Sequence, residues 1–303
     1  MGFSRQSVGF VLVTAGVMAG CSTPQSTHPR TAPPPAAPAN APAGNAGGAP
    51  PALSSAPRYN AGRQAYNVVS TGTVGVAGDS GSAPDTVRTD ALVRFNADWT
   101  GTGLDVTGTV VWRVSASSAA LQSLVNAPVD PVPFRATVDT ARSTVRFAND
   151  SGTATHCPAA NAAALAAVRE LLADVPRTLA PGSSWVDTVV TTTCRGEIPV
   201  TSTAVRRFAV TLERVSTNSE GVDILVSHTS AVELRGQTTR SGSSQPIVVS
   251  GTGSGQSSQH YTALTGRLVS STSASDIDLS VGLPGRAARL HQHAESQVKP
   301  ATP

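Results

Sequence analysis

The sequence of 303 residues is poor in lysine and in aromatic side chains. Lys299 is the single lysine among 22 basic residues, and aromatic residues make up 4% of the chain. We interpret the excess of arginine as a composition bias, which by itself gives no argument for an arginine-rich binding surface. The scarcity of aromatic side chains means that a core must consist mostly of Val, Leu, Ile and Ala.

The larger part of the chain also lacks net charge. The formal charge of +3 is accounted for by Arg5, Arg30 and Arg58, because every acidic residue lies beyond residue 58. The remainder is formally neutral, which argues against nucleic-acid binding. Arg206-Arg207 is the only adjacent basic pair, and in a strand its two side chains point to opposite faces.

No apolar run is long enough to span a bilayer comfortably. The stretch from Val8 to Val17 is short, follows Arg5, and precedes the small residues of Met18-Ala19-Gly20-Cys21. This order of a basic residue, an apolar segment and small residues is typical of a secretion signal. A plain secretion signal and a short membrane helix are the alternatives.

The segment that ends at Cys21 resembles the lipobox of bacterial lipoproteins, with Met18 where leucine is commoner. The resemblance implies that residues 1–20 are removed and that Cys21 carries the acyl (palmitate-type) anchor. Ser22 is not acidic, which in diderm bacteria implies sorting to the outer membrane. With a single membrane, the anchor would lie on the outer face of the cytoplasmic membrane.

Residues 21–58 comprise the anchor cysteine and a segment rich in proline and alanine, with Pro33-Pro34-Pro35 in its middle. Such a segment cannot bury enough apolar surface to fold, so we predict a disordered linker. A Pro-rich chain extends at about 3.1 Å per residue and could reach on the order of 100 Å from a membrane. Residues 59–299 then form one domain, followed by a tail at 300–303.

Only two cysteines, Cys157 and Cys194, remain in the exported domain. A pair of cysteines in an oxidising compartment favours a disulfide. A metal site of His156, Cys157 and Cys194 is the alternative, but it lacks a fourth ligand at a usual spacing.

Period-two alternation dominates the domain and predicts antiparallel strands. Residues 90–99 and 104–114 alternate on either side of the turn at Thr100-Gly103 and predict a hairpin with one apolar face. Further strands are predicted around 63–77, 132–139, 143–148, 185–194, 198–213, 221–235, 245–251, 257–271, 275–282 and 286–298, with a turn at 216–221.

One segment departs from this pattern. Residues 159–174 are rich in alanine, with Leu165, Val168, Leu171 and Leu172 at helical spacing, and Pro176 ends the pattern. A second short helix is possible over 117–126. We therefore predict a mainly β fold: one large curved antiparallel sheet or open half-barrel with one main helix at about 159–174 packed over it.

This architecture is similar in outline to the half-barrel of bacterial lipoprotein carriers and lipid-binding lipoproteins, the LolA/LppX-like group. Pro181-Gly182-Ser183-Ser184-Trp185 is similar to Pro-Gly-x-x-Trp segments of uncharacterised exported β-proteins, where the segment opens the second half of the sheet. Neither resemblance supplies a catalytic residue.

The sequence contains no convincing catalytic or cofactor motif. Gly251 to Gly255 is glycine-rich without a following helix, so we predict a flexible hairpin loop. His291 and His293 share a strand face and could ligate a metal with His260 or Asp278, but an exposed polar face is favoured. Asp276 and Asp278 are likewise assigned to a solvated face, and His228 to the core or a cavity edge.

Three functions are compatible with these patterns. The first is a non-catalytic binding module, in which the sheet holds a lipid or another hydrophobic ligand; its candidate lining residues are Val93, Phe95, Trp99, Val110 and Trp112. The second is a structural or protein-docking envelope lipoprotein with a filled core. An enzyme is the least favoured. No cofactor, metal or nucleic-acid partner is predicted. The predicted partner is the membrane, which the chain contacts through the lipid anchor at Cys21.

Overall fold

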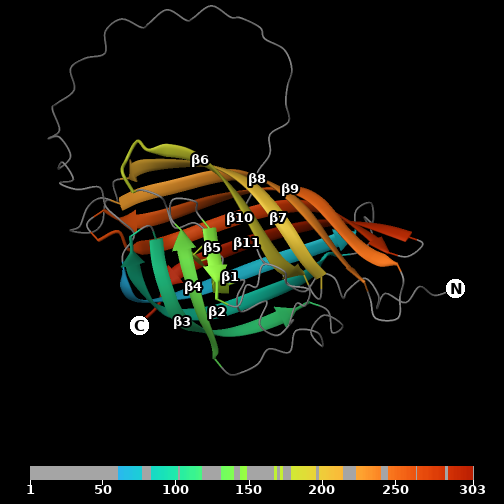
Figure 1. Ribbon diagram of the computed structural model, residues 1–303, viewed down its shortest axis with the longest axis horizontal. Coiled ribbons are helices and arrows are strands. Elements are labelled where there is room, and N and C mark those ends of the chain that lie inside the picture. The colour runs from blue at the N-terminus through green and yellow to red at the C-terminus, as the bar shows by residue number, and fades with distance from the viewer. Residues whose placement is uncertain are drawn as a thin grey trace, which may run out of the picture.

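The described part of the chain forms one antiparallel sheet of eleven strands, shown by a computed structural model in Figure 1. The structure describes residues 61–76, 83–101, 103–117, 131–139, 144–148, 167–168, 171–172, 179–195, 198–213, 223–239, 245–263, 265–283 and 286–302. Its strands are β1 (Gly62–Val76), β2 (Asp85–Thr100), β3 (Gly103–Ala116), β4 (Val132–Asp139), β5 (Thr144–Phe147), β6 (Ser184–Arg195), β7 (Ile198–Glu213), β8 (Asp223–Thr239), β9 (Pro246–Thr262), β10 (Leu268–Leu283) and β11 (Arg286–Pro300).

Consecutive strands pair with each other, with two exceptions: β1 pairs with β11, and β5 and β6 lie at opposite edges of the sheet. The order is β5-β4-β3-β2-β1-β11-β10-β9-β8-β7-β6, so β1 joins an N-terminal and a C-terminal half through β11. The pairing of Tyr66 with Pro300 begins this seam, and the amide of Ala301 extends it with a 2.8 Å hydrogen bond to the carbonyl of Ala65. The sheet curls into an open half-barrel, which confirms the predicted fold class in its β part (Figure 1).

The hairpin predicted over residues 90–114 is confirmed as β2 and β3. Thr100 pairs with Gly103 at its tip, and Val93 pairs with Val110 in its middle. Val93, Phe95, Val110 and Trp112 face the inside of the curl and are buried, whereas Asp90 and Arg94 face outward. The alternation follows from the pleat, which turns successive side chains to opposite faces.

The inner face carries two separate apolar clusters. The large cluster covers β1 to β5 and the near ends of β7 to β11; it includes Tyr66, Val93, Phe95, Leu104, Val110, Trp112, Phe134, Phe208, Ile224 and Tyr261. The small cluster lies at the other ends of the C-terminal strands and comprises Ile198, Val200, Ala204, Val232, Leu234, Val249, Ile277, Leu279, Val281 and Leu290. Each fully buried side chain of this kind contributes about 1.5–3 kcal/mol.

The predicted loop at Gly251 to Gly255 is wrong, because this segment lies in the middle of β9. The register continues through it, pairing Gly251 with Leu279 and Gly253 with Ile277. A Cβ at Gly253 would lie 2.7 Å from Cγ1 of Ile277, so the missing side chains leave room for those of the neighbouring strand. The break predicted between residues 271 and 275 is also absent, since β10 is continuous there.

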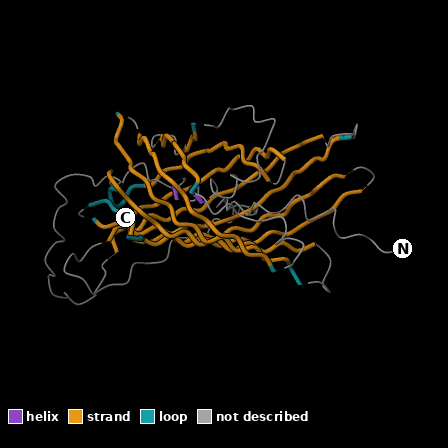
Figure 2. The backbone as a smooth tube through the Cα atoms, turned by 90° about the horizontal axis from the view of Figure 1, so that it is seen from below, coloured by secondary structure: helices purple, strands orange, loops and turns teal. Residues whose placement is uncertain are grey.

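The main helix predicted at about 159–174 is not shown as an element. The structure describes four of its residues, Ala167, Val168, Leu171 and Leu172, which are helical and buried in the large cluster (Figure 2). The rest of this prediction lies outside the described residues, as do the turn at 216–221 and all but Ser117 of the second helix predicted over 117–126. No helix in the described part of the chain has the length and apolar character needed to cross a bilayer.

Candidate functional site

Two rows of inward-facing residues, aromatic or charged on β6 and β7 and mostly small on the other strands, cross the inner face beside the apolar clusters. The first, here called the aromatic–hydroxyl row, follows the register from β6 to β2 through Trp185, Phe208, His228, Ser257, Ser273, Ser296, Ser70 and Thr89. The second, the ion-pair row, runs beside it through Asp187, Arg206, Ser230, Gly255, Ser275, Ala294 and Gly72. The rows are therefore aromatic and charged at their β6–β7 end, and their side chains are small towards β1.

Every buried polar or charged side chain of the described residues belongs to the inner face. The set comprises Gln64, Asp187, Ser202, Arg206, His228, Ser230, Ser257, Gln259, Ser271, Ser273, Ser275, Gln292 and Ser296. Buried polar groups cost free energy unless they are hydrogen-bonded, so their concentration on one face points to a shared role.

Several buried polar atoms of the inner face have no hydrogen-bond partner among the described residues. They are the hydroxyls of Ser202, Ser257 and Ser296, together with the indole nitrogens of Trp112 and Trp185. Each of the three serines is at most 6% exposed. Leaving such a group unsatisfied costs about 1–3 kcal/mol, which a polar group of a bound molecule or a water would recover.

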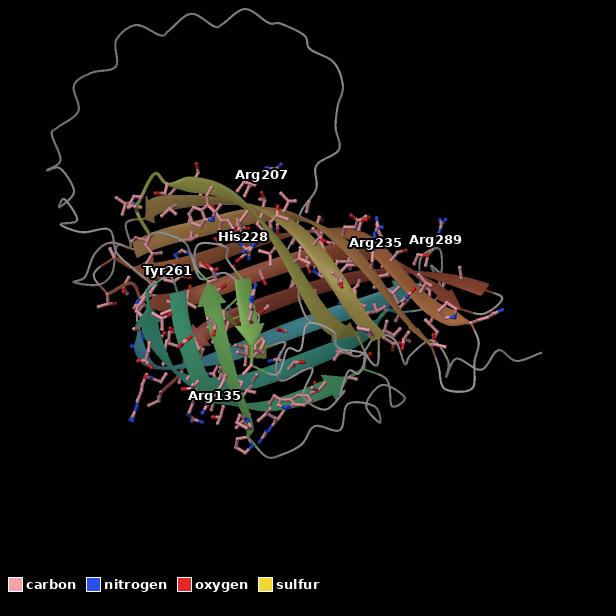
Figure 3. All side chains as sticks on the ribbon, in the orientation of Figure 1. Arg135, Arg207, His228, Arg235, Tyr261 and Arg289 are labelled. Carbon is pink, nitrogen blue, oxygen red and sulfur yellow. The ribbon has the colours of Figure 1, made fainter. Side chains whose placement is uncertain are left out.

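A buried ion pair closes the β6 side of the site. Nε of Arg206 lies 3.0 Å from Oδ1 of Asp187, and Nη2 lies 3.3 Å from Oδ2. Both side chains are 5% exposed, and the guanidinium carbon lies 5.0 Å from the centroid of the Phe208 ring. Arg207 is exposed, so the two arginines point to opposite faces as predicted, and Arg207 projects beyond the outline of the ribbon (Figure 3).

An aromatic stack stands beside the ion pair. The Phe208 ring lies 4.7 Å from Trp185, nearly parallel to it, and 4.7 Å from His228 on its other side. His228 is 3% exposed, which confirms its predicted place in the interior. Trp185 follows a turn in which Gly182 has a φ of 82°, so the Pro-Gly-x-x-Trp segment does open strand β6.

The predicted lining residues lie in or beside the large cluster. Val93, Phe95, Val110 and Trp112 are at most 5% exposed there, and Trp99 is 38% exposed near the β2–β3 turn. The four buried residues lie next to the aromatic–hydroxyl row, since the pair of Ala91 and Trp112 is one inward-facing position away from the pair of Thr89 and Val114.

The outer face carries an open groove of about 1220 Å³ over the ends of β7 to β11. Its polar lining belongs to outward-facing positions, among them Glu233, Arg235, Ser250, Asp278 and Arg289. Arg235 forms an exposed ion pair with Glu233 and projects away from the sheet (Figure 3). None of the predicted lining residues belongs to this groove.

The histidines predicted on a polar strand face form an outer ladder with carboxylates. Nδ1 of His291 lies 2.9 Å from Asp278, Nδ1 of His293 lies 2.8 Å from Asp276, and Nε2 of His293 lies 3.3 Å from Glu295. These side chains are 38% to 81% exposed, which confirms a solvated face. The described residues contain no group of three or more His, Cys, Asp or Glu side chains that could hold a metal ion.

The modification sites remain predictions. Cys21 and Cys157 lie outside the described residues, and the structure gives the backbone but not the side chain of Cys194. Only the sequence therefore supports the lipid anchor at Cys21 and the disulfide between Cys157 and Cys194.

Sequence reasoning missed the two polar rows. Their signal was present in β10 as serines at every second position, where Ser273 and Ser275 belong to the rows and Ser271 is the next inward-facing residue. A row that runs across eight strands becomes visible only when the register of each pair is known, and a one-residue slip would turn these serines outward.

Comparison with known proteins identifies no family. No protein-family model and no curated protein sequence matches the chain. Solved structures with a loose likeness include Neisserial surface protein A (7% identity, 78% of this chain and 96% of that chain, TM-score 0.22). Others are the beta domain of the Bordetella autotransporter Brka (8%, 78% and 99%, 0.26) and OpdQ of Pseudomonas aeruginosa (7%, 80% and 98%, 0.24). At these TM-scores the likenesses carry no argument about function.

Proposed function

We propose that this protein is a non-catalytic lipoprotein of the bacterial cell envelope whose inner sheet face binds an amphiphilic ligand. Cys21 holds the chain at the outer membrane, and residues 21–58 serve as a tether. The apolar part of the ligand packs on the large cluster, and its polar part lies over the aromatic–hydroxyl row. The observation that carries the proposal is the set of buried serine hydroxyls without partners among the described residues.

The floor of the site supports a ligand because its own side chains are small. Ser257, Ser273 and Ser296 stand in one row, and Gly255, Ser275 and Ala294 stand in the next. Serine, glycine and alanine side chains project little from the sheet, whereas the flanking clusters present large apolar groups. This combination of an apolar wall and a few convergent polar groups is typical of small-molecule sites.

A catalytic role has less support. Ser257 lies opposite His228 in register, but its hydroxyl has no hydrogen-bond partner among the described residues. Asp187 is held by Arg206 rather than by a histidine. Within the described part of the chain, Ser257 therefore lacks the hydrogen bond to a base that activates a nucleophile.

The anchor is tested by labelling cells with an alkyne analogue of palmitate. The wild-type chain should incorporate the label and fractionate with outer membranes, whereas Cys21→Ser should lose both. Ser22→Asp is the matched variant for sorting, and it should keep the label but move to the cytoplasmic membrane. Incorporation of label by Cys21→Ser would contradict the proposed anchor.

Ligand binding is tested with the full chain carrying Cys21→Ser, which removes the covalent acyl group. The uncharged fluorescent probe N-phenyl-1-naphthylamine should bind saturably. Ser257→Leu fills the floor and should weaken probe binding at least tenfold. Ser258→Leu on the outer face of the same strand is the control and should leave binding unchanged.

Two outcomes would contradict binding at this site: no saturable probe signal, or equal binding by wild type and Ser257→Leu. Because Ser257→Leu could also disturb folding, its urea midpoint is compared with that of Ser258→Leu. Ser296→Val repeats the test on β11 with a smaller added volume, and normal binding by a folded Ser296→Val would also count against the site.

A second candidate function, protein docking, is favoured by the edge strand β6. Val186 and Val190 on its outer face are 59% and 60% exposed, and β6 ends the strand order of the described sheet. An edge strand with outward apolar residues can pair with a partner chain. Val190→Lys should then abolish cross-linking to a partner in intact cells without changing probe binding.

A further inference from the structure

We infer that the inner face selects uncharged amphiphiles, whose polar part carries hydroxyl or ester groups, over amphiphiles with an anionic headgroup. This inference rests on the proposed binding function and adds the chemical class of the ligand. It follows from the charges that are buried beside the site and from the kind of hydrogen-bonding groups that line it.

The buried charges of the site already compensate each other. Among the described residues, Asp187 and Arg206 are the buried side chains with a permanent charge, and they form a two-point contact. A carboxylate or phosphate brought to this face would therefore add an uncompensated charge to a surface withdrawn from water. Such a charge is strongly disfavoured unless a cation is free to pair with it.

The guanidinium is also held on one side of the site. Asp187 on β6 and the Phe208 ring on β7 both contact Arg206, and each contact lies at the β6–β7 end of the rows. The floor formed by β9 to β11 contributes serines instead of basic side chains at its inward positions. An anionic headgroup over this floor would have hydroxyls as its nearest partners.

The lining hydroxyls suit an uncharged polar group. Ser257 and Ser296 lie on either side of Ser273 in the aromatic–hydroxyl row. The Oγ atoms of Ser257 and Ser296 have no hydrogen-bond partner within the described part of the chain. A serine hydroxyl can both donate and accept a hydrogen bond. It can therefore satisfy the hydroxyl or the ester carbonyl of a glyceride-like headgroup without any transfer of charge.

The test measures displacement of N-phenyl-1-naphthylamine from the full chain carrying Cys21→Ser at pH 8, with every lipid below its micellar concentration. Monolaurin and methyl laurate should displace the probe at concentrations at least tenfold below that of laurate, whose carboxyl group is ionised. Displacement by laurate at the same or a lower concentration would overturn the inference. Absence of probe binding would instead overturn the proposed function.

A charge variant tests the cause of the selectivity. Asp187→Asn removes the buried carboxylate that is paired with Arg206, so the preference for monolaurin over laurate should fall at least tenfold. Asp90→Asn is the matched control, because it removes the carboxylate of the exposed pair with Arg88 on the outer face. An unchanged preference in folded Asp187→Asn would overturn the inference, and the ester-against-acid comparison in the wild type tests it independently of that variant.

Discussion

At the scale of single residues, the ion pair of Asp187 and Arg206 matters for the stability of the fold, because both side chains are only 5% exposed. Arg206→Met removes the cation and leaves a buried carboxylate, which should lower the free energy of unfolding by about 3–5 kcal/mol. The double variant Asp187→Leu/Arg206→Met should recover most of that loss. Urea unfolding of the full chain measures both.

The exposed pair of Arg88 and Asp90 is the control for this prediction. Their side chains are 52% and 48% exposed, although Nη2 of Arg88 lies 2.8 Å from the carboxylate. Arg88→Met should cost no more than about 1 kcal/mol, because solvent screens a surface pair. Equal losses in the free energy of unfolding for Arg88→Met and Arg206→Met would contradict the burial of the pair of Asp187 and Arg206.

His293 provides a prediction about pH. Its hydrogen bond to Asp276, with a smaller contribution from Glu295, raises its pKa above the ordinary value of 6.5. Since the folded-state pKa is the higher one, the interaction stabilises the fold below pH 6.5 and is lost as pH rises through the raised pKa. The effect is small because His293 is 38% exposed.

An NMR titration of the imidazole protons measures this directly. Asp276→Asn should move the pKa of His293 back towards its ordinary value, while Asp278→Asn, whose carboxylate contacts His291 instead, serves as the comparison. An identical His293 titration in wild type and Asp276→Asn would refute the assignment of Asp276 as the main cause.

At the scale of elements, β9 shows how a strand can be built around glycines. Gly253 faces Ile277, and a Cβ there would lie 2.6 Å from the carbonyl oxygen of Asp276. Gly253→Ala should therefore destabilise the domain by about 1–3 kcal/mol, since a backbone atom cannot rotate away. Thermal or urea unfolding measures the change.

Gly101 is the matched position for this experiment. It lies in the β2–β3 turn, and a Cβ there would have nothing within 4 Å. Gly101→Ala should change the free energy of unfolding by less than about 0.5 kcal/mol. A Gly253→Ala variant as stable as Gly101→Ala would mean that the close approach of β9 and β10 relaxes without cost.

The elements also show what a sequence can predict. The alternation of apolar and polar residues was sufficient to predict the β2–β3 hairpin, where Val93 and Val110 face inward. Within each strand, this alternation shows which side chains share a face. It failed at Gly253, since glycine in a strand and glycine in a loop look alike until the partner strand is known. The helix at about 159–174 was predicted from apolar spacing, of which the structure describes Val168, Leu171 and their two neighbours.

At the scale of the whole molecule, the pairing register of the strands brings the residues of the site together. The aromatic–hydroxyl row brings Trp185 of β6 into line with Thr89 of β2 through seven strand pairings. No local pattern specifies such a row, which is why the sequence predicted apolar lining residues such as Val93 but not the serines beside them. The seam between β1 and β11 is what joins the two halves around it.

The central claim is that the inner face holds an uncharged amphiphile, and the native mass spectrum of the exported full chain carrying Cys21→Ser tests it most directly. Purified without detergent, the protein should carry a reproducible extra mass that organic solvent releases and that is an uncharged lipid. Ser257→Leu should lack this mass, and Ser258→Leu should keep it. A spectrum of the bare chain alone, or the same bound mass in Ser257→Leu, would contradict the claim.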